Sequence, residues 1–296
     1  MSMPAPGDSP SVADRAVWKS PADNHVHSQW SWDTQSGDMV RTCERARELG
    51  LPAIAFTEHL DLTRWTLPPT VTLPAEWSSF IHDDTMQAPM LDVSGYLASV
   101  AECRERFPNL RILSGLEISE PHWHRDEVTA LIATGEFERL LASQHSGPLL
   151  SGAGMMEFSA LYLDRTPREV VDLYLAQILE LVTQSDHFQV LAHIDYPVRY
   201  WPSDGPEFDP RDFSDGFHAV LEALAASGRA LECNTRVPLA FEILSWWHDV
   251  GGTAITFASD AHHPDALALG FRAATDLATA AGFRAGTDPI AFWGRA

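Results

Sequence analysis

Short apolar stretches alternate with longer amphipathic stretches along most of the chain. The short ones are bounded by turn residues and are too brief for helices, so they predict buried strands: Ala22–His27, Leu51–Phe56, Arg111–Leu116, Arg139–Ser143, Phe188–Ala192, Ala230–Cys233 and Ala254–Ala258. The longer ones repeat apolar residues with helical spacing and predict helices: Gly37–Leu49, Asp92–Phe107, Arg125–Thr134, Thr166–Ser185, Asp212–Ser227, Leu239–Val250 and Pro264–Ala281. Seven strand-then-helix units without a sustained hairpin pattern indicate an α/β fold with a parallel sheet. Seven units in 296 residues favour a closed or nearly closed TIM-like barrel.

Three segments fall outside this alternation. Residues 1–20 are rich in Pro, Ser and Ala and predict a poorly ordered tail, which leaves residues 21–296 as one domain. Leu60–Leu91 contains four prolines and Gly147–Leu163 contains three glycines, so both are predicted to be irregular loops. A structureless insertion as long as the first is usually functional, and we expect it to be a lid or a loop that shapes the substrate site.

Polar side chains follow nearly every predicted strand. His25 and His27 lie two residues apart, so on a strand both imidazoles point to the same side. Asp33 follows on a loop long enough to fold back with an oxygen ligand. The carboxyl ends of the strands in an α/β barrel meet at one mouth, where the chemistry takes place. The residues at or just after these strand ends are His25, His27, His59, Glu117, His145, His193, Asp260 and His262.

Six histidines and three carboxylates at one mouth are too many ligands for a single ion, since divalent ions take about four to six ligands each. The set suits two or three divalent ions with one bridging carboxylate. The absence of thiolates among the nine residues favours Zn²⁺, Mn²⁺ or Fe²⁺. Metal ions a few ångström apart activate a hydroxide and bind both oxygens of an in-line displacement. The pattern therefore predicts phosphoester hydrolysis.

The charge of the chain restricts its partners. There are 41 acidic and 20 basic residues, for a net charge of −21. This argues against binding long nucleic acid or anionic lipid, both of which need a basic surface. A small anionic substrate remains compatible, if metal ions and a few arginines reverse the field locally.

The cysteines and the apolar runs indicate a cytoplasmic protein. The three cysteines, Cys43, Cys103 and Cys233, are odd in number and show no C-x-x-C spacing, which fits a reducing compartment. The first twenty residues lack the apolar region of a signal peptide. No apolar run reaches the ~18 residues that a membrane span needs, so no membrane association is expected.

Taken in order, the strand-end motifs resemble those of the polymerase and histidinol phosphatase (PHP) family over essentially all of residues 22–285. The motifs are His25-Val26-His27 with Asp33, Thr57-Glu58-His59, Gly115-Leu116-Glu117, Ser143-Gln144-His145, Ala192-His193-Ile194-Asp195 and Ser259-Asp260-Ala261-His262. The resemblance implies a distorted seven-stranded (β/α) barrel with a trinuclear metal site.

The resemblance also implies how the ligands divide among the ions. His25, His27, Glu117 and Asp260 would hold the first ion. Glu117 would bridge to the second, together with His145 and His193, and Asp33, His59 and His262 would hold the third. Some members of the family carry a histidine at the position of Asp33, where a carboxylate still ligates. Glu117, Asp260 and His262 are expected to carry the catalytic step.

Within the family, His193-Ile194-Asp195 and Glu232-Cys233-Asn234-Thr235 resemble the histidinol-phosphatase branch. The implied activity is hydrolysis of a small phosphomonoester by a metal-activated hydroxide, with histidinol phosphate as the leading candidate substrate. One alternative is a phosphodiesterase or nuclease acting on short nucleotides. Another is a non-catalytic, metal-binding regulatory module, although the complete ligand set argues against it.

Two arginines follow strand-end motifs, namely Arg199 and Arg236. A guanidinium binds phosphate through two parallel hydrogen bonds, so both residues are candidates for binding the substrate phosphate. The alternative for each is a salt bridge on the surface of a very acidic protein.

Overall fold

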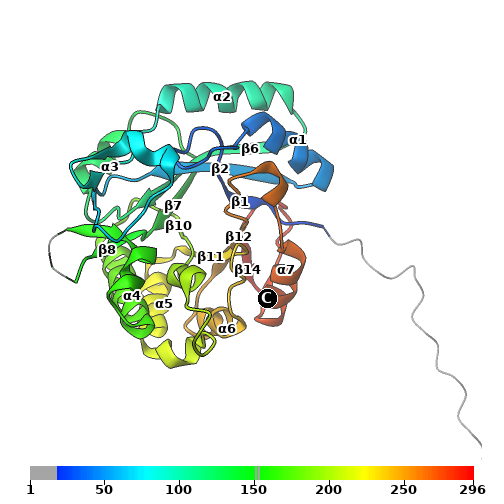
Figure 1. The fold of residues 1–296 in the computed structure, drawn as a ribbon. Coiled ribbons are helices and arrows are strands. Elements are labelled where there is room, and N and C mark those ends of the chain that lie inside the picture. Colours follow the sequence, from blue (N-terminus) through cyan, green and yellow to red (C-terminus); the bar gives the residue numbers. More distant parts are fainter. Residues whose placement is uncertain (1–18, 151, 153) are drawn as a thin grey trace, which may run out of the picture.

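The computed structural model describes residues 19–150, 152 and 154–296, and most of the predicted N-terminal tail, residues 1–18, lies outside them. Within the described residues, seven parallel strands form a ring enclosed by helices, with α1 and α2 on one side and α4, α5 and α6 on the other (Figure 1). The strands of the ring are β1 (Asp23–Val26), β2 (Ala53–Leu60), β6 (Arg111–Ser119), β7 (Arg139–Ser143), β10 (Val190–Leu191), β11 (Ala230–Asn234) and β12 (Ala254–Ala258). The predicted seven-stranded (β/α) barrel is confirmed.

The first and last strands of the ring close the barrel. β1 pairs in parallel with β12 through Asp23 and Phe257, and with β2 on its other side. The register between β1 and β2 shifts between Asp23 and Val26, so the barrel is distorted where it closes. This closure brings the end of β1 to the segment that follows β12, where Val26 bridges to Ala261.

Most helices begin and end close to the predicted positions, but the last begins at Phe271 and not at Pro264, because the segment before it forms a short 3₁₀ helix and a turn. The helices are α1 (Met39–Leu49), α2 (Val93–Arg106), α3 (Arg125–Ile132), α4 (Pro167–Gln184), α5 (Ser214–Ser227), α6 (Phe241–Asp249) and α7 (Phe271–Ala280). The start of α4 shows why: the Thr166 side chain accepts from the Glu169 amide, and the Glu169 side chain accepts from the Thr166 amide. Short 3₁₀ helices lie at η2 (Ala75–Phe80), η3 (Phe158–Leu163), η4 (Tyr196–Tyr200), η5 (Pro210–Phe213) and η6 (Pro264–Ala266).

The prediction of two irregular insertions is wrong, because together they form a second sheet. Its strands are β3 (Trp65–Thr66), β4 (Ile81–His82), β5 (Thr85–Met86), β8 (Ser146–Pro148) and β9 (Met155–Glu157), in the order β4-β5-β3-β9-β8. The two insertions meet where Trp65 of β3 pairs in parallel with Met155 of β9. Strands of two or three residues are too short to show an alternating pattern in the sequence.

The chain also contains antiparallel pairs that the sequence pattern does not indicate. β14 (Trp293–Arg295) pairs antiparallel with both β12 and β13 (Phe283–Arg284), beyond the last predicted helix. Of the barrel strands, β2 and β6 continue past their predicted ends. His59 and Glu117 therefore lie within paired strands and face each other in register.

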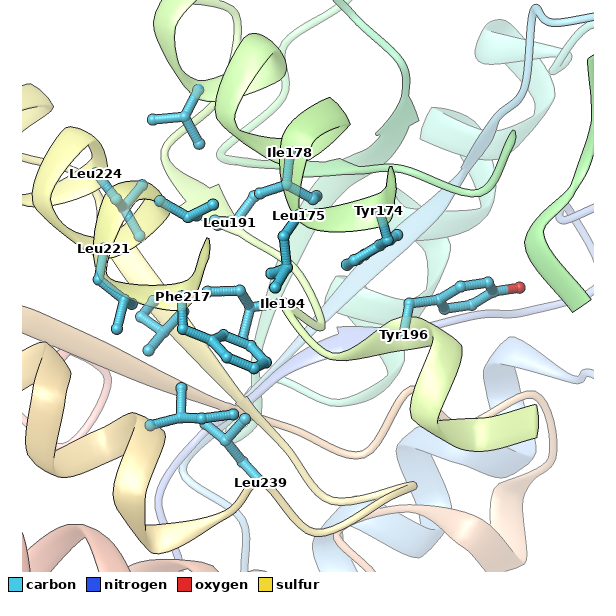
Figure 2. Close-up of a cluster of buried hydrophobic side chains, with 14 of the residues drawn as sticks. Tyr174, Leu175, Ile178, Leu191, Ile194, Tyr196, Phe217, Leu221, Leu224 and Leu239 are labelled. Atoms are coloured by element: carbon cyan, nitrogen blue, oxygen red, sulfur yellow. The ribbon is translucent and has the colours of Figure 1, made fainter. Parts of the chain in front are cut away.

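The main apolar core lies between the barrel and helices α4 to α6. Leu175 and Ile178 of α4 meet Leu191 of β10 and Leu221 of α5 there, all of them buried (Figure 2). Tyr196 lies at the edge of this cluster, and in Figure 2 its ring points away from the aliphatic side chains, with the hydroxyl at the far end. Among residues 19–150, 152 and 154–296, we find no helix with both the length and the apolar character needed to cross a bilayer.

Candidate metal centre

The structure brings all nine predicted ligands together at the carboxyl-terminal mouth of the barrel. His25 lies in β1, His59 in β2 and Glu117 in β6, and the others come from the segments that directly follow β1, β7, β10 and β12. Their ligand atoms form overlapping groups within 4.8 Å: His27, His59 and His262; His25, His27 and Asp260; and Glu117, His145 and His193. A fourth group joins His59 and His145 to Asp61.

Glu117 is at the centre of this arrangement. Its Oε2 lies 3.1 Å from His25 Nε2, 3.2 Å from His59 Nδ1 and 3.4 Å from His27 Nε2. Its Oε1 lies 2.7 Å from His193 Nε2 and 3.3 Å from His145 Nε2. The two oxygens therefore face different histidines, which is the geometry expected of a bridging carboxylate.

The hydrogen bonds on the outer side of two histidines fix which nitrogen faces the centre. His25 Nδ1 lies 2.7 Å from the Glu232 carboxylate and donates to it. His27 Nδ1 donates to Ser31 Oγ at 2.9 Å, because the Ser31 hydroxyl itself donates to Glu58. In the neutral form of each ring, which is the form that binds a metal ion, Nε2 therefore carries the lone pair.

Those two lone pairs point at each other, since His25 Nε2 and His27 Nε2 are 3.0 Å apart. Glu117 Oε2 faces the same point, is buried, and accepts no hydrogen bond within the described residues. Two imidazole lone pairs and a carboxylate oxygen in such close approach repel one another unless a cation lies among them. The residues present thus fit a divalent metal ion.

Asp33, His59 and His262 show the same close approach of ligand atoms. His262 Nδ1 donates to the Asp260 carbonyl at 3.0 Å, so its Nε2 lone pair faces Asp33 Oδ2 at 3.1 Å. His59 Nε2 lies 3.4 Å from the same Asp33 oxygen. A carboxylate oxygen between two imidazoles, both at the mouth, is a further oxygen–nitrogen site for a divalent ion.

The charge states of the centre depend on burial and on mutual proximity. Burial alone would raise the pKa of Glu117, but His25, His145 and His59 hold that pKa well below its usual range. Burial alone would lower the pKa of His145, but Glu117 raises it well above the ordinary value. Burial lowers the pKa of His193 to about 4, which leaves it neutral. Divalent ions binding here therefore displace protons from imidazoles such as His145.

Two residues that orient the ligands were not predicted. Glu232 is fully buried in β11 and accepts from His25 Nδ1 and from the His193 amide, at 2.7 and 3.0 Å. Asp61 accepts from Ser119 Oγ and from Trp32 Nε1, and Ser119 in turn accepts from His145 Nδ1. Asp61 could have been found from the sequence, because it lies two residues after His59, directly past the end of β2, and repeats the His25–His27 spacing.

Both candidate phosphate-binding arginines reach the mouth. Arg199 Nη2 lies 2.6 Å from Asp260 Oδ2, and its side chain is 11% exposed. Arg236 is half exposed, with Nη1 3.7 Å from the same oxygen and 3.5 Å from His262 Nδ1. Asp260 itself has a left-handed backbone, with φ of 52°, which is uncommon outside glycine and is typical of functional sites.

A cavity of about 610 Å³ opens above these ligands. Its floor includes Glu117, His145 and His193, and both arginines reach it. The two insertions form its walls, through residues such as Trp77 and Glu157. A pocket of this size suits a small organic ligand.

The sequence profile of the PHP domain matches residues 23–236. The chain belongs to the PHP domain family. Among curated relatives it is 25% identical to histidinol-phosphatase of Lactococcus lactis, over 81% of this chain and 83% of the relative. It is also 25% identical to a probable histidinol-phosphatase of Clostridium acetobutylicum, over 86% and 92% of the two chains.

Solved structures of this PHP domain protein's relatives share its fold. The crystal structure of histidinol phosphate phosphatase from Lactococcus lactis, in complex with zinc, L-histidinol and phosphate, aligns with a TM-score of 0.74 and 24% identity. The alignment covers 93% of this chain and 99% of that one. A putative histidinol phosphatase from Listeria monocytogenes aligns with a TM-score of 0.67 and 15% identity, over 85% and 99% of the chains.

Proposed function

We propose that this PHP domain protein is a metal-dependent phosphomonoesterase. The observation that carries the proposal is Glu117, whose two oxygens face separate histidines beneath two guanidinium groups. Divalent ions at these ligands supply the Lewis acidity that polarises a phosphoryl oxygen and acidifies water. We propose two or three divalent ions, held by the nine predicted ligands in the sets that the family resemblance implies.

The protein's own side chains position the phosphate. Arg236 is half exposed at the cavity and is free to turn its guanidinium fork toward two phosphoryl oxygens. Arg199 is buried against Asp260, so it presents a fixed positive charge at the same place. Together they offset, at this mouth, the strongly negative charge of the chain as a whole.

We further propose histidinol phosphate as the substrate. Support comes from the curated relatives, whose names carry this activity and which match most of the chain, and from a cavity with room for a small amine. The solved relative with L-histidinol and phosphate bound shares the fold.

A phosphate-release assay over a panel of phosphorylated metabolites tests both proposals, with the protein supplied with Zn²⁺, Mn²⁺ or Fe²⁺. We expect hydrolysis of histidinol phosphate to exceed that of the other monoesters, and a chelator to abolish it. Release from bis(p-nitrophenyl) phosphate at a rate above that from p-nitrophenyl phosphate would instead favour the phosphodiesterase alternative. No turnover of any ester by metal-loaded protein would favour the regulatory module.

A further inference from the structure

Glu157 is a carboxylate in the wall of the cavity that the proposed metal chemistry does not use. It ends β9, in the second insertion, and its backbone pairs with Ser146 of β8. Its Oε1 accepts a 2.8 Å hydrogen bond from the Tyr196 hydroxyl. Its Oε2 accepts from the Ser159 amide at 3.0 Å and from the Ser159 hydroxyl. The carboxylate is thus held in one orientation beside the cavity.

The hydrogen-bond donors to Glu157 in the described part of the chain are all neutral. Arg199 is near enough to influence it, but that guanidinium is already paired with Asp260. Burial raises the pKa of Glu157 to about 7, against the smaller opposing effects of Tyr196 and His145. A carboxylate that is fixed, poorly solvated and without its own cation is suited to bind a cationic group of a ligand.

Tyr196 connects this carboxylate to the metal centre. Its ring centroid lies 5.0 Å from the ring centroids of both His145 and His193. The Arg199 guanidinium lies over the same ring, 4.9 Å from its centroid. The phosphate end of the site and Glu157 are therefore separated by a single tyrosine side chain, and Figure 2 shows its hydroxyl at the end remote from the apolar core.

The first insertion and the loop after β1 contribute aromatic side chains to the cavity. Trp32 and Trp77 both line it, with ring centroids 4.8 Å apart and the rings edge to face. Trp65 also lines it, 6.2 Å from Trp32. The cavity thus offers a carboxylate from one insertion and aromatic surface from the other, which suits a ligand with a separate cation and a planar ring.

We propose that Glu157 binds the primary ammonium group of the substrate and so makes this phosphatase selective for aminoalkyl phosphates. The inference rests on the proposed phosphomonoesterase function. In histidinol phosphate the ammonium group is on the carbon next to the one that carries the ester oxygen. An ester with its phosphate at the metal centre then directs its ammonium group along Tyr196, whose ring lies beside His193 and whose hydroxyl donates to Glu157.

The test compares two esters that differ only in the amine: histidinol phosphate and 3-(imidazol-4-yl)propyl phosphate. We expect wild-type kcat/KM to be about 10- to 100-fold higher for the amine, the range of one charge-assisted hydrogen bond. Glu157→Gln keeps the shape of the side chain, and it should remove this preference while leaving the des-amino ester nearly unaffected. The matched control is Glu180→Gln, an exposed carboxylate on α4, which should keep the wild-type ratio.

Three results would overturn the assignment. The first is a wild-type enzyme that hydrolyses both esters equally well. The second is a Glu157→Gln variant that keeps the wild-type preference. The third is an equal loss on both esters, which would place Glu157 in proton transfer to the leaving group instead. A wild-type protein that hydrolyses neither of these esters nor any other monoester contradicts the proposed function itself, and is distinguishable from all three.

Discussion

His25 Nδ1 and Glu232 Oε2 lie 2.7 Å apart in the barrel interior, where neither side chain is exposed to solvent. Glu232 also accepts from the His193 amide, so one carboxylate orients ligands from two strands. This bond keeps the proton on Nδ1 and leaves His25 Nε2 available to a metal ion.

Glu232→Gln should therefore lower metal affinity by roughly 10- to 100-fold, because the amide no longer stabilises the required form of His25. Competition with a chelator of known affinity measures this. Circular dichroism should show that the fold is retained, and Glu222→Gln on the exposed face of α5 provides the control. Equal metal affinity in all three proteins would exclude the orienting role.

Glu117→Gln should lower phosphate release by orders of magnitude, because the bridging negative charge is lost from two ion sites at once. The side chain keeps its volume, so we expect an unchanged fold by circular dichroism. Elemental analysis of the variant should show fewer bound ions than the wild type. Activity within a few-fold of wild type would contradict a bridging role.

Arg236→Lys keeps the charge but loses the planar fork that binds phosphate through two hydrogen bonds. One charge-assisted hydrogen bond contributes roughly 1.5–3 kcal/mol, so kcat/KM should fall roughly 10- to 100-fold. Inhibition by inorganic phosphate should weaken in parallel, while metal content stays constant. Normal phosphate inhibition would mean that Arg236 only forms surface ion pairs and that Arg199 should be tested next.

Removal of metal should destabilise the fold as well as stop hydrolysis. Binding at 100 times the dissociation constant stabilises a protein by about 2.7 kcal/mol, which for a large domain corresponds to a rise in Tm of roughly 5–10 °C. We expect chelation to lower Tm by that amount and two or three divalent ions per chain to restore it. Elemental analysis showing less than one ion in metal-supplemented protein would contradict the centre.

His122 should make folding sensitive to acid. Burial lowers its pKa to about 4, with a further contribution from His124, and neither ring nitrogen has a hydrogen-bond partner in the described part of the chain. The unfolded chain then binds a proton at this residue near pH 6.5 and the folded chain does not. The free energy of unfolding is therefore unaffected by this residue above pH 6.5, and it decreases as the pH falls from 6.5 toward 4.

His122→Leu removes the titrating group and should flatten this dependence. In metal-free protein, urea midpoints of the variant and the wild type should be similar at pH 7, and the variant should be the more stable at pH 5. If the urea midpoints of both proteins fell by the same amount between pH 7 and pH 5, His122 would already be accessible to protons in the folded state.

The repeated strand–helix pattern was sufficient to predict the barrel, because each unit is long enough to show its period. It was also sufficient to predict which side chains meet at the mouth, since strands such as β2 and β6 carry their ligands at corresponding ends. Their roles as ligands remain predictions. Contacts across the barrel were not predictable. The sequence around Glu232 indicates only a buried strand, and its contact with His25, 207 residues earlier, arises only in the folded barrel.

The second sheet was missed for a different reason. Its strands hold two or three residues each, too few to show an alternating pattern, and the pair that joins the two insertions links residues 90 positions apart. The prolines and glycines of these segments correctly mark turns, but turns alone do not reveal that Trp65 and Met155 pair. The same limit applies to β13 and β14 at the end of the chain.

The pairing of β3 with β9 makes the two insertions one structural unit, although the paired residues Trp65 and Met155 are 90 positions apart and the barrel segment 92–146 lies between the insertions. A change in one insertion shifts the backbone of the other through that shared edge. These two segments are thus expected to diverge together among relatives. A graft between relatives should succeed only when both are exchanged together.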